Sequence, residues 1–302
     1  MRYLVTGGAG FIGSHLVERL LENDNIVVVL GDFSEGKLEY LPLDNPNLVI
    51  YEASILEPIR ELFAYIDIVF HLAALPRPQK SIVEPEGAND VNVTGTLRVL
   101  MACRENKVKR MVFASSASLY GEQDKTPTPE WVEPHPMSPY GLQKRIGEEY
   151  CQLFESLYGL ETNCLRLFNV YGDRMNPNGE YASMMPKFIA LLKAGQRPPI
   201  YGTGFQSRDY VYIDDVVNAF LAAAQSEVHG EIFNIGSETT YSVRLIFEML
   251  RTHLKANIDA IFEPALIEPD ITLSDCKKAH ELLGWHNNTS LSQGIDRIVE
   301  CY

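Results

Sequence analysis

The chain has 302 residues, of which 46% are hydrophobic and 22% are charged, as in an ordinary globular protein with a sizeable core. Its net charge of −14 argues against binding to nucleic acid or to an acidic membrane through bulk positive charge. No apolar run reaches the ~20 residues that span a bilayer, so we expect no membrane partner. The five cysteines are scattered and odd in number, so we expect reduced thiols and a cytoplasmic location. Neither the cysteines nor the seven histidines show metal-ligand spacing, so we expect no metal.

A glycine-rich turn follows the first predicted strand. Residues 3–5 are apolar and predict a strand, and the apolar positions between residues 11 and 21 predict an amphipathic helix. Glycines at G-x-x-G-x-x-G spacing let the chain turn sharply and approach a pyrophosphate, which the N–H groups of the helix N-terminus then bind. A plain glycine-rich turn is the alternative, but the strand–turn–helix context favours dinucleotide binding. The predicted contacts are Gly7, Gly10, Phe11, Ile12 and Gly13.

Five more apolar stretches predict strands that alternate with helices. The strands span residues 26–30, 48–51, 66–70, 109–113 and 162–167, and the helices include residues 57–65, 89–106 and a segment from about Tyr140. This alternation implies an α/β fold, a Rossmann-like doubly wound parallel sheet whose ligand crevice lies at the carboxyl ends of the strands.

Two strand ends in this half are candidate cofactor contacts. Asp32 follows the second strand, where a carboxylate accepts both ribose hydroxyls and repels a 2′-phosphate. Leu72, Ala73 and Ala74 follow the fourth strand, where small residues let a cofactor lie close. We interpret the preceding His71 as a packed strand-end histidine.

After Phe168 the pattern loosens. Helices are predicted for residues 184–194, 214–225, 243–255, 275–283 and 291–301, with short strands at residues 210–212 and 232–235. We interpret this part as a smaller C-terminal lobe that closes the crevice and contacts the substrate. The expected division is a dinucleotide-binding domain at residues 1–168 and a mainly substrate-binding lobe at residues 169–302, with some segments returning to the first domain.

A serine-rich strand end and a Y-x-x-x-K pair carry the predicted chemistry. Ser115 and Ser116 end the fifth strand, and Tyr140 and Lys144 share one face of the next helix. A free tyrosine has a pKa near ~10, so it is a poor base at neutral pH. A lysine ammonium one turn away and the positive charge of an oxidised nicotinamide favour the phenolate. A surface pair is the default interpretation of this spacing, but beside the glycine motif it predicts catalysis by Ser116, Tyr140 and Lys144.

Together these motifs resemble the extended short-chain dehydrogenases/reductases of the NAD-dependent sugar-nucleotide epimerase/dehydratase family. UDP-glucose 4-epimerases are the branch that the chain resembles most. The resemblance covers essentially the whole chain, and the set of motifs is very specific for the family. The matching stretches are residues 6–13, 71–74, 92–96, 115–121, 140–144, 166–172, 208–215 and 283–285.

The resemblance implies further site residues. Phe168 would line the nicotinamide site, and Asn169 and Arg208 would hold the substrate's diphosphate, although a surface ion pair with Asp209 is the alternative for Arg208. Thr272 falls at a position that sets the room for the sugar. Ala265 stands where the family usually has a second phosphate-binding arginine, so diphosphate binding is expected to be either weaker or differently built. Further expected cofactor contacts are Ser54, Ile55, Asn92, Ser115 and Lys144. Tyr140 is expected to contact both cofactor and substrate, and Ser116 the substrate.

The residues after Ser116 indicate the reaction. Ala117 and Ser118 stand where the family's dehydratases carry a carboxylate pair, so dehydration is disfavoured. The resemblance therefore implies NAD-dependent epimerisation at C4 of a nucleotide-diphospho-sugar through a transient keto intermediate. UDP-glucose, UDP-galactose or their N-acetyl forms are the expected substrates, and NADP stays open as cofactor.

Two alternatives to an epimerase stay open. A net NAD(P)-dependent keto-sugar-nucleotide reductase or dehydrogenase is the alternative enzyme, and a non-catalytic dinucleotide-binding protein is the alternative class. The family resemblance also suggests a homodimer formed by the helices at residues 89–106 and 140–157.

Overall fold

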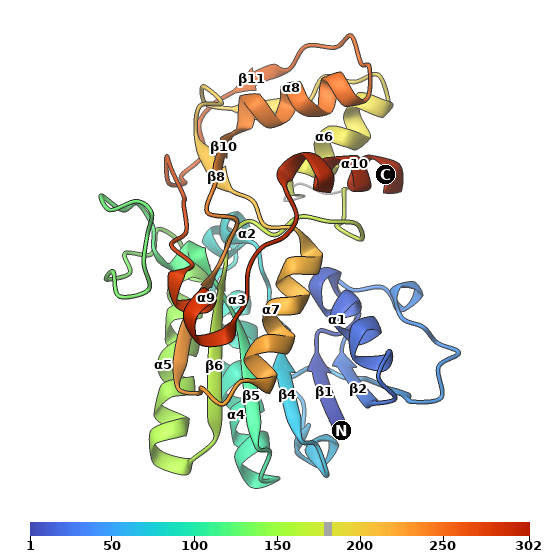
Figure 1. The fold of residues 1–302 in the computed structure, drawn as a ribbon, viewed down its shortest axis with the longest axis vertical. Helices are drawn as coiled ribbons and strands as arrows, with labels where there is room; N and C mark the ends of the chain where they lie inside the picture. Colours follow the sequence, from blue (N-terminus) through green and yellow to red (C-terminus); the bar gives the residue numbers. More distant parts are fainter. Residues whose placement is uncertain (178–182) are drawn as a thin grey trace.

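The computed structural model describes residues 1–177 and 183–302 and is built on a seven-stranded parallel sheet (Figure 1). The strand order is β3-β2-β1-β4-β5-β6-β9, with the first strand inside the sheet and the order reversing on either side of it. This order and its flanking helices confirm the predicted Rossmann-like, doubly wound fold. The strands are β1 (Arg2–Thr6), β2 (Ile26–Gly31), β3 (Leu48–Glu52), β4 (Ile68–His71), β5 (Arg110–Ser116), β6 (Glu161–Leu167) and β9 (Glu231–Ile235).

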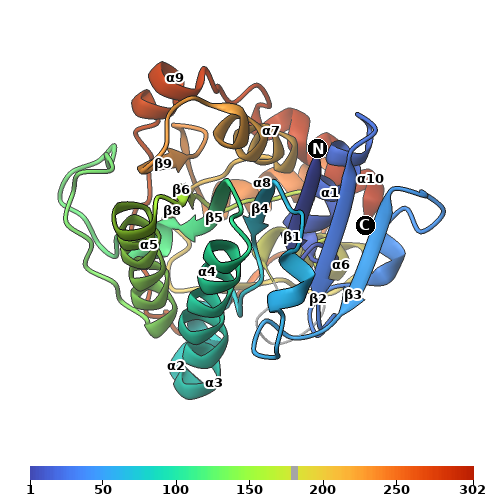
Figure 2. The same ribbon diagram turned by 90° about the horizontal axis from the view of Figure 1, so that it is seen from below.

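Helices cover both faces of this sheet (Figure 2). Helices α1 (Phe11–Leu21) and α7 (Ile213–Gln225) pack on one face, while α4 (Thr96–Glu105) and α5 (Pro139–Tyr158) pack on the other. Alternate side chains of a strand point to opposite faces, so Val5 joins the first core and Leu4 the second. Burial on both sides explains why these strands are continuous apolar runs.

The smaller lobe lies above the carboxyl ends of the strands (Figure 1). It contains α6 (Met184–Lys193), α8 (Val243–His253) and α10 (Leu291–Cys301). Strands β7 (Pro199–Tyr201) and β11 (Ile261–Glu263) form a parallel pair, and β8 (Ser207–Asp209) and β10 (Thr240–Ser242) form an antiparallel pair. The predicted helices after residue 168 are all present, with ends within two residues of the expected ones.

Several predicted elements are wrong in type or in place. Residues 57–65 form only a short 3-10 helix, Arg60–Phe63, because Pro58 precedes it and Tyr65 adopts a positive φ of 62°. The expected strand at residues 210–212 is not one, since β8 ends at Asp209 and Tyr212 makes only an isolated bridge to Tyr171. The strand expected at residues 232–235 is present as β9, and it pairs with β6 in the main sheet.

The predicted helix at residues 89–106 is divided. It comprises the end of α3 (Pro85–Asn89), a π-helical turn (Asp90–Gly95) and α4. A short helix, α2 (Pro78–Val83), precedes it, and α9 (Lys277–Leu283) packs near β9. The chain therefore passes the carboxyl end of β4 through several short helical segments before the long helices begin.

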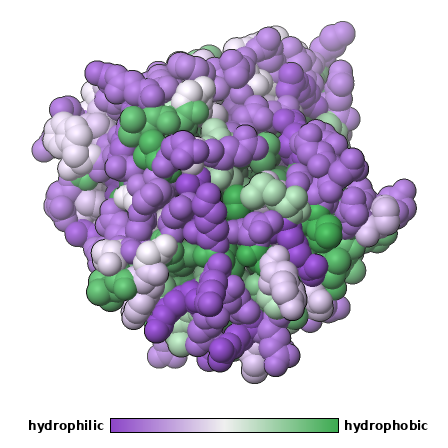
Figure 3. Space-filling model, turned by 60° about the horizontal axis from the view of Figure 1, so that its bottom comes forward, coloured by the Kyte–Doolittle hydropathy of each residue, from purple (hydrophilic) through white to green (hydrophobic). Residues whose placement is uncertain are grey.

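The surface is mainly polar. The lower face of the molecule is mostly hydrophilic, with its apolar atoms in separate patches (Figure 3). Within residues 1–177 and 183–302, no helix combines the length and the apolar character needed to cross a membrane.

Candidate active site

One cavity of about 990 Å³ lies between the carboxyl ends of the strands and the smaller lobe. Its walls come from the glycine-rich turn, the ends of β2, β4, β5 and β6, the start of α5, and segments around Arg208 and Thr272. Of the predicted site residues, all line this cavity except Asn92 and Phe168. The fold thus gathers side chains that are up to about 265 positions apart in the sequence, from Gly7 to Thr272.

The glycine-rich turn is closely packed. Gly7 has a φ of +69°, and a Cβ there would lie 2.9 Å from the backbone nitrogen of Ala73. A Cβ on Gly13 would overlap the carbonyl oxygen of Gly7. Helix α1 starts after Gly10 with no capping side chain and no acidic residue in its first turn. Its first N–H groups are therefore left for an anion, which fits the pyrophosphate of a dinucleotide.

The adenosine end of the cavity carries a carboxylate. Asp32 lines the cavity and accepts hydrogen bonds from the backbone N–H and hydroxyl of Ser34, at 3.0 and 2.7 Å. Nearby Lys37 pairs with Glu39 at 3.1 Å. A carboxylate accepts the hydroxyls of a ribose and repels a 2′-phosphate, so this end of the cavity could hold a ribose with a free 2′-hydroxyl.

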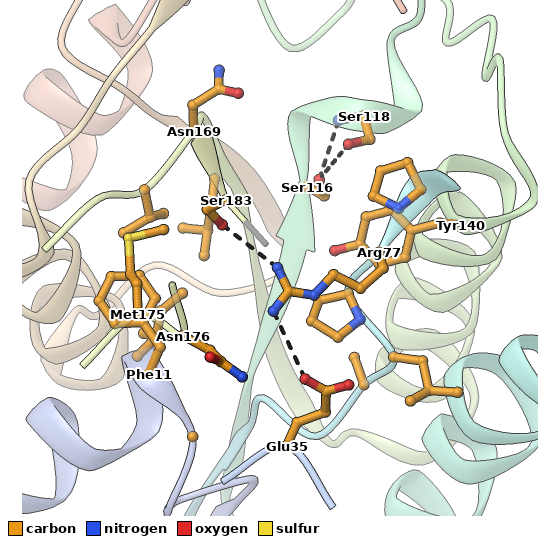
Figure 4. A pocket seen from close by; sticks show the side chains of 18 of the residues that line it. Phe11, Glu35, Arg77, Ser116, Ser118, Tyr140, Asn169, Met175, Asn176 and Ser183 are labelled. Carbon is orange, nitrogen blue, oxygen red and sulfur yellow. Dashed lines mark hydrogen bonds and ion pairs between the residues drawn. The ribbon is translucent and has the colours of Figure 1, made fainter. Parts of the chain in front are cut away.

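Ser116, Tyr140 and Lys144 all line this cavity. Figure 4 shows Ser116 and Tyr140 near its middle. Ser116 is the last residue of β5, and its hydroxyl lies 3.1 Å from that of Ser118. Helix α5 begins at Pro139, capped by Ser138, so Tyr140 and Lys144 lie in its first two turns. Both are buried, with relative exposures of 7% and 4%. The Lys144 Nζ lies 5.8 Å from the centre of the Tyr140 ring.

Burial controls the protonation of this group. It raises the pKa of Tyr140 to about 12, against smaller lowering effects from the Ser116 hydrogen bond and the Arg77 charge. It lowers the pKa of Lys144 to about 8, partly offset by nearby groups that include Glu148. The protein alone therefore holds Tyr140 as a neutral phenol that can donate a proton.

His71 is packed, as the sequence indicated. It is fully buried at the end of β4, between the hydroxyls of Thr6 and Thr96 at 2.7 and 3.0 Å. Burial and the nearby Lys144 charge lower its pKa to about 3. The ring is therefore neutral at physiological pH and holds two segments of the backbone together.

Two predicted cofactor residues lie behind the cavity wall. Asn92 accepts a hydrogen bond from the Leu75 backbone N–H at 2.8 Å and donates to the Gln143 side chain at 2.8 Å. It thereby supports the segment after β4. Phe168 is 1% exposed and packs in a small cluster with Leu119 and Tyr120. In this structure the neighbouring side chain of Asn169 faces the cavity instead.

The far wall holds the expected substrate residues. Arg208 is 8% exposed and pairs with Glu268 at 2.9 Å, so it does not form the surface pair with Asp209 that was the alternative. Asn169 donates to the Thr272 hydroxyl at 3.3 Å. Ala265, where an arginine was expected, is exposed and does not line the cavity. Arg208 is therefore the buried cation of this wall.

A buried ion pair supports the catalytic segment and was missed from the sequence. Glu148 lies one turn after Lys144 on α5 and accepts a hydrogen bond from the Ser115 hydroxyl at 2.5 Å. Its carboxylate also pairs with Arg166 of β6 at 2.8 Å. The spacing of Tyr140, Lys144 and Glu148 at successive turns was the available signal. This contact fixes α5 against the ends of β5 and β6.

Most of the chain matches a known protein family. Residues 3–236 match the family model described as the NAD-dependent epimerase/dehydratase family. This chain belongs to that family. Among the residues that the structure describes, no three His, Cys, Asp or Glu side chains gather as a group that could hold a metal.

Relatives and solved structures of this family are similar throughout. A UDP-glucose 4-epimerase of Mycolicibacterium smegmatis is 37% identical, over 100% of this chain and 98% of the relative. The structure of UDP-glucose 4-epimerase from Thermotoga maritima with UDP-glucose has a TM-score of 0.95 at 38% identity, covering 100% and 98% of the two chains. The UDP-glucuronic acid 4-epimerase of Bacillus cereus, with UDP-glucuronic acid and NAD, has a TM-score of 0.94 at 31% identity, with the same coverage.

Proposed function

We propose that this chain is an NAD-dependent epimerase of nucleotide-diphospho-sugars that inverts C4 of a UDP-linked hexose. The observation that carries the proposal is the meeting of Ser116, Tyr140 and Lys144 in one cavity with the glycine-rich turn and Arg208. The first wall fits a dinucleotide pyrophosphate, and the buried cation of the second fits a substrate diphosphate. The family membership and the similar UDP-sugar 4-epimerases support the same function.

In the proposed mechanism, Tyr140 removes the proton of the sugar C4 hydroxyl and later returns it. When bound, NAD supplies the acceptor and donor of the hydride at C4. Ser116 would hydrogen-bond the same sugar oxygen and hold it in place as its charge changes. Lys144 donates from Nζ to the Ala114 carbonyl at 2.7 Å, which fixes its ammonium beside Tyr140. Ala117 and Ser118 offer no carboxylate for the elimination of water.

Tyr140 needs added positive charge to act as a base. Its pKa of about 12 keeps it protonated at neutral pH in the protein alone. An oxidised nicotinamide ring carries a positive charge, and an opposite charge within a few ångströms favours the ionised form of a phenol. Deprotonation of Tyr140 is therefore coupled to the oxidised state of the cofactor, which suits an enzyme that regenerates its cofactor in each turnover.

The organisation of the molecule is part of the proposal. Residues 1–168 would form the dinucleotide-binding domain and residues 169–302 mainly the substrate lobe, with α7 and β9 returning to the first. A homodimer would form through α4 and α5, and its support is a set of exposed apolar side chains on these helices. The exposed side chains are Met101, Leu142, Leu153, Leu157 and Tyr158.

We place the protein in the cytoplasm, where its five free cysteines stay reduced.

The test is direct. The purified protein is incubated with UDP-galactose, UDP-N-acetylgalactosamine or UDP-glucuronate, with and without added NAD, and the nucleotide-sugars are separated by chromatography. Interconversion at C4 without net NADH is the expected result. Stoichiometric consumption of NAD(P)H with a keto-sugar substrate would instead mark a reductase. Cofactor binding with no conversion of any nucleotide-sugar would mark a binding protein.

A further inference from the structure

Arg77 lines the cavity but has no role in the proposed reaction. It lies between the end of β4 and the start of α2, and its side chain is 23% exposed. Figure 4 shows its guanidinium reaching into the middle of the cavity, between Glu35 and Ser183 and beside Tyr140. Its charge is one of the two influences that lower the pKa of Tyr140. Arg77 is therefore a fixed positive charge next to the reacting centre.

Within residues 1–177 and 183–302, the contacts of Arg77 are long for an arginine in a cavity. Its Nη2 lies 3.7 Å from a Glu35 carboxylate oxygen, and its Nη1 lies 3.5 Å from the Ser183 hydroxyl. Charge-assisted N–H···O bonds are typically about 2.7–2.9 Å long. Two other arginines that line the same cavity reach that range, Arg208 with Glu268 at 2.9 Å and Arg174 with Glu18 at 2.7 Å. The guanidinium of Arg77 can thus accept a better-placed anion.

The backbone beside Arg77 is tied to Tyr140. The carbonyl of Arg77 accepts a hydrogen bond from the backbone N–H of Ser81 at 2.9 Å. The hydroxyl of the same Ser81 accepts one from the backbone N–H of Tyr140 at 3.0 Å. These two bonds fix the start of α2 against the start of α5. The distance between the guanidinium and the reacting centre is therefore set by the fold.

We propose that Arg77 binds a carboxylate that the sugar carries beside its reacting carbon, so that carboxylated nucleotide-sugars are the preferred substrates. This inference rests on the proposed function, which places C4 at Tyr140. The neighbours of C4 are C3 and C5, so the carboxylate is either C6 of a uronic acid, attached to C5, or an acid linked through an ether at C3. The planar fork of an arginine matches a carboxylate with two parallel N–H···O bonds.

Phosphate is a poorer match for Arg77. The glycine-rich turn and α1 serve the pyrophosphate of the cofactor, and Arg208 stands at the far wall for the substrate diphosphate. Arg77 lies beside Tyr140 instead (Figure 4). A group bound there contacts the sugar ring and neither of the two diphosphates.

Calorimetric titration of the purified holoenzyme tests the proposal. UDP-glucuronate, UDP-N-acetylmuramate and UDP-glucose are compared on the wild-type protein and on Arg77→Gln. We expect at least one acid to bind the wild type more tightly than UDP-glucose, and Arg77→Gln to weaken that acid about 10- to 100-fold. UDP-glucose should change less than about threefold. If Arg77→Gln loses affinity only for UDP-glucuronate, Arg77 binds a carboxylate attached to C5. If the variant loses affinity only for UDP-N-acetylmuramate, Arg77 binds a carboxylate linked at C3.

Three further variants make the test specific. Arg77→Lys keeps the charge without the fork and should recover part of the lost affinity. Glu35→Gln removes the carboxylate that competes for Arg77 and should tighten binding of the acid. Arg60→Gln, which breaks a surface pair with Glu105 at 2.8 Å, is the matched control and should change nothing.

Three results would overturn the proposal: no preference of the wild type for either acid, equal weakening of acid and neutral ligands, or loss of bound NAD from Arg77→Gln. The last would mean that the arginine serves the cofactor. Because binding is measured directly, carboxylate-dependent affinity without any C4 interconversion would refute the epimerase function and leave the carboxylate site standing.

Discussion

The ammonium of Lys144 donates to the carbonyl oxygen of Ala114 at 2.7 Å, which joins the second turn of α5 to β5 just before its last two residues, Ser115 and Ser116. The bond sets the separation between the helix that carries Tyr140 and the strand that carries Ser116. Burial lowers the pKa of Lys144 to about 8, so its charge is sensitive to mildly alkaline pH.

Activity should therefore fall as pH rises through about 8, because Lys144 then loses its ammonium, whose positive charge 5.8 Å from the centre of the Tyr140 ring is expected to favour a phenolate there during the reaction. The pH profile of kcat/KM checks this. Lys144→Arg keeps a charge to far higher pH, so its profile should stay flat through this range even if its overall activity is lower. An identical alkaline limb in that variant would assign the titration to another group.

The same shift has a consequence for stability. The folded-state pKa of Lys144 lies below that of the unfolded chain, so between pH 8 and about 10.5 the unfolded state binds more protons. The contribution of Lys144 to the free energy of unfolding should therefore rise with pH in this window. Urea unfolding of wild type and Lys144→Met at several pH values measures it, and a difference independent of pH would contradict it.

Tyr140→Phe should reduce kcat by about 10²–10⁴-fold while the protein still binds NAD, since only the phenolic hydroxyl is removed. Steady-state kinetics and the NAD content of the purified variant are the measurements. Tyr150→Phe, on the same helix but outside the residues that line the cavity, is a suitable control. Full activity in Tyr140→Phe would remove this residue from the mechanism.

Asp32→Ser should relax the choice of cofactor. The carboxylate at the end of β2 repels a 2′-phosphate, and its removal should reduce the preference for NAD over NADP by about 10-fold or more. Dissociation constants of both cofactors, from fluorescence titration, give the ratio. If the ratio is unchanged, the carboxylate that Ser34 already engages does not reach the ribose.

Glu148→Gln should destabilise the protein by about 3–5 kcal/mol, because it leaves the Arg166 guanidinium buried without its carboxylate. Thermal unfolding measures the loss. A double variant, Glu148→Leu with Arg166→Met, should lose less than the single variant, since neither charge is then left alone. If the double variant is less stable than Glu148→Gln, the ion pair contributes more to stability than the mutual compensation of its two buried charges.

The sequence predicted those parts of the fold and site that depend on local pattern. Residues 26–30 are buried on both faces, and their unbroken apolar run predicted β2. The spacing of Tyr140 and Lys144 predicted that they would share a cavity. The family prediction is confirmed by the family model over residues 3–236.

The failures have a common physical cause. The pairing of β9 with β6 was not predicted, because the two strands lie more than 60 positions apart and no local pattern records that pairing. The roles of Arg77 and Glu35 were missed because their segments follow different strands and meet only through the parallel sheet. Residues 178–182 belong to the expected substrate lobe at residues 169–302, and they fall outside the described residues.

The position of β9 means that neither half of this chain is a self-sufficient folding unit. A fragment that stops at residue 168 would expose β6 as an unpaired sheet edge, which invites aggregation. It would also lose α7, whose last carbonyls accept hydrogen bonds from Arg110 at 2.8 Å and Asn163 at 3.1 Å, both of them buried. Gene fusions on this scaffold therefore need the whole chain. Split-protein designs need both fragments together, with the break placed in an exposed loop.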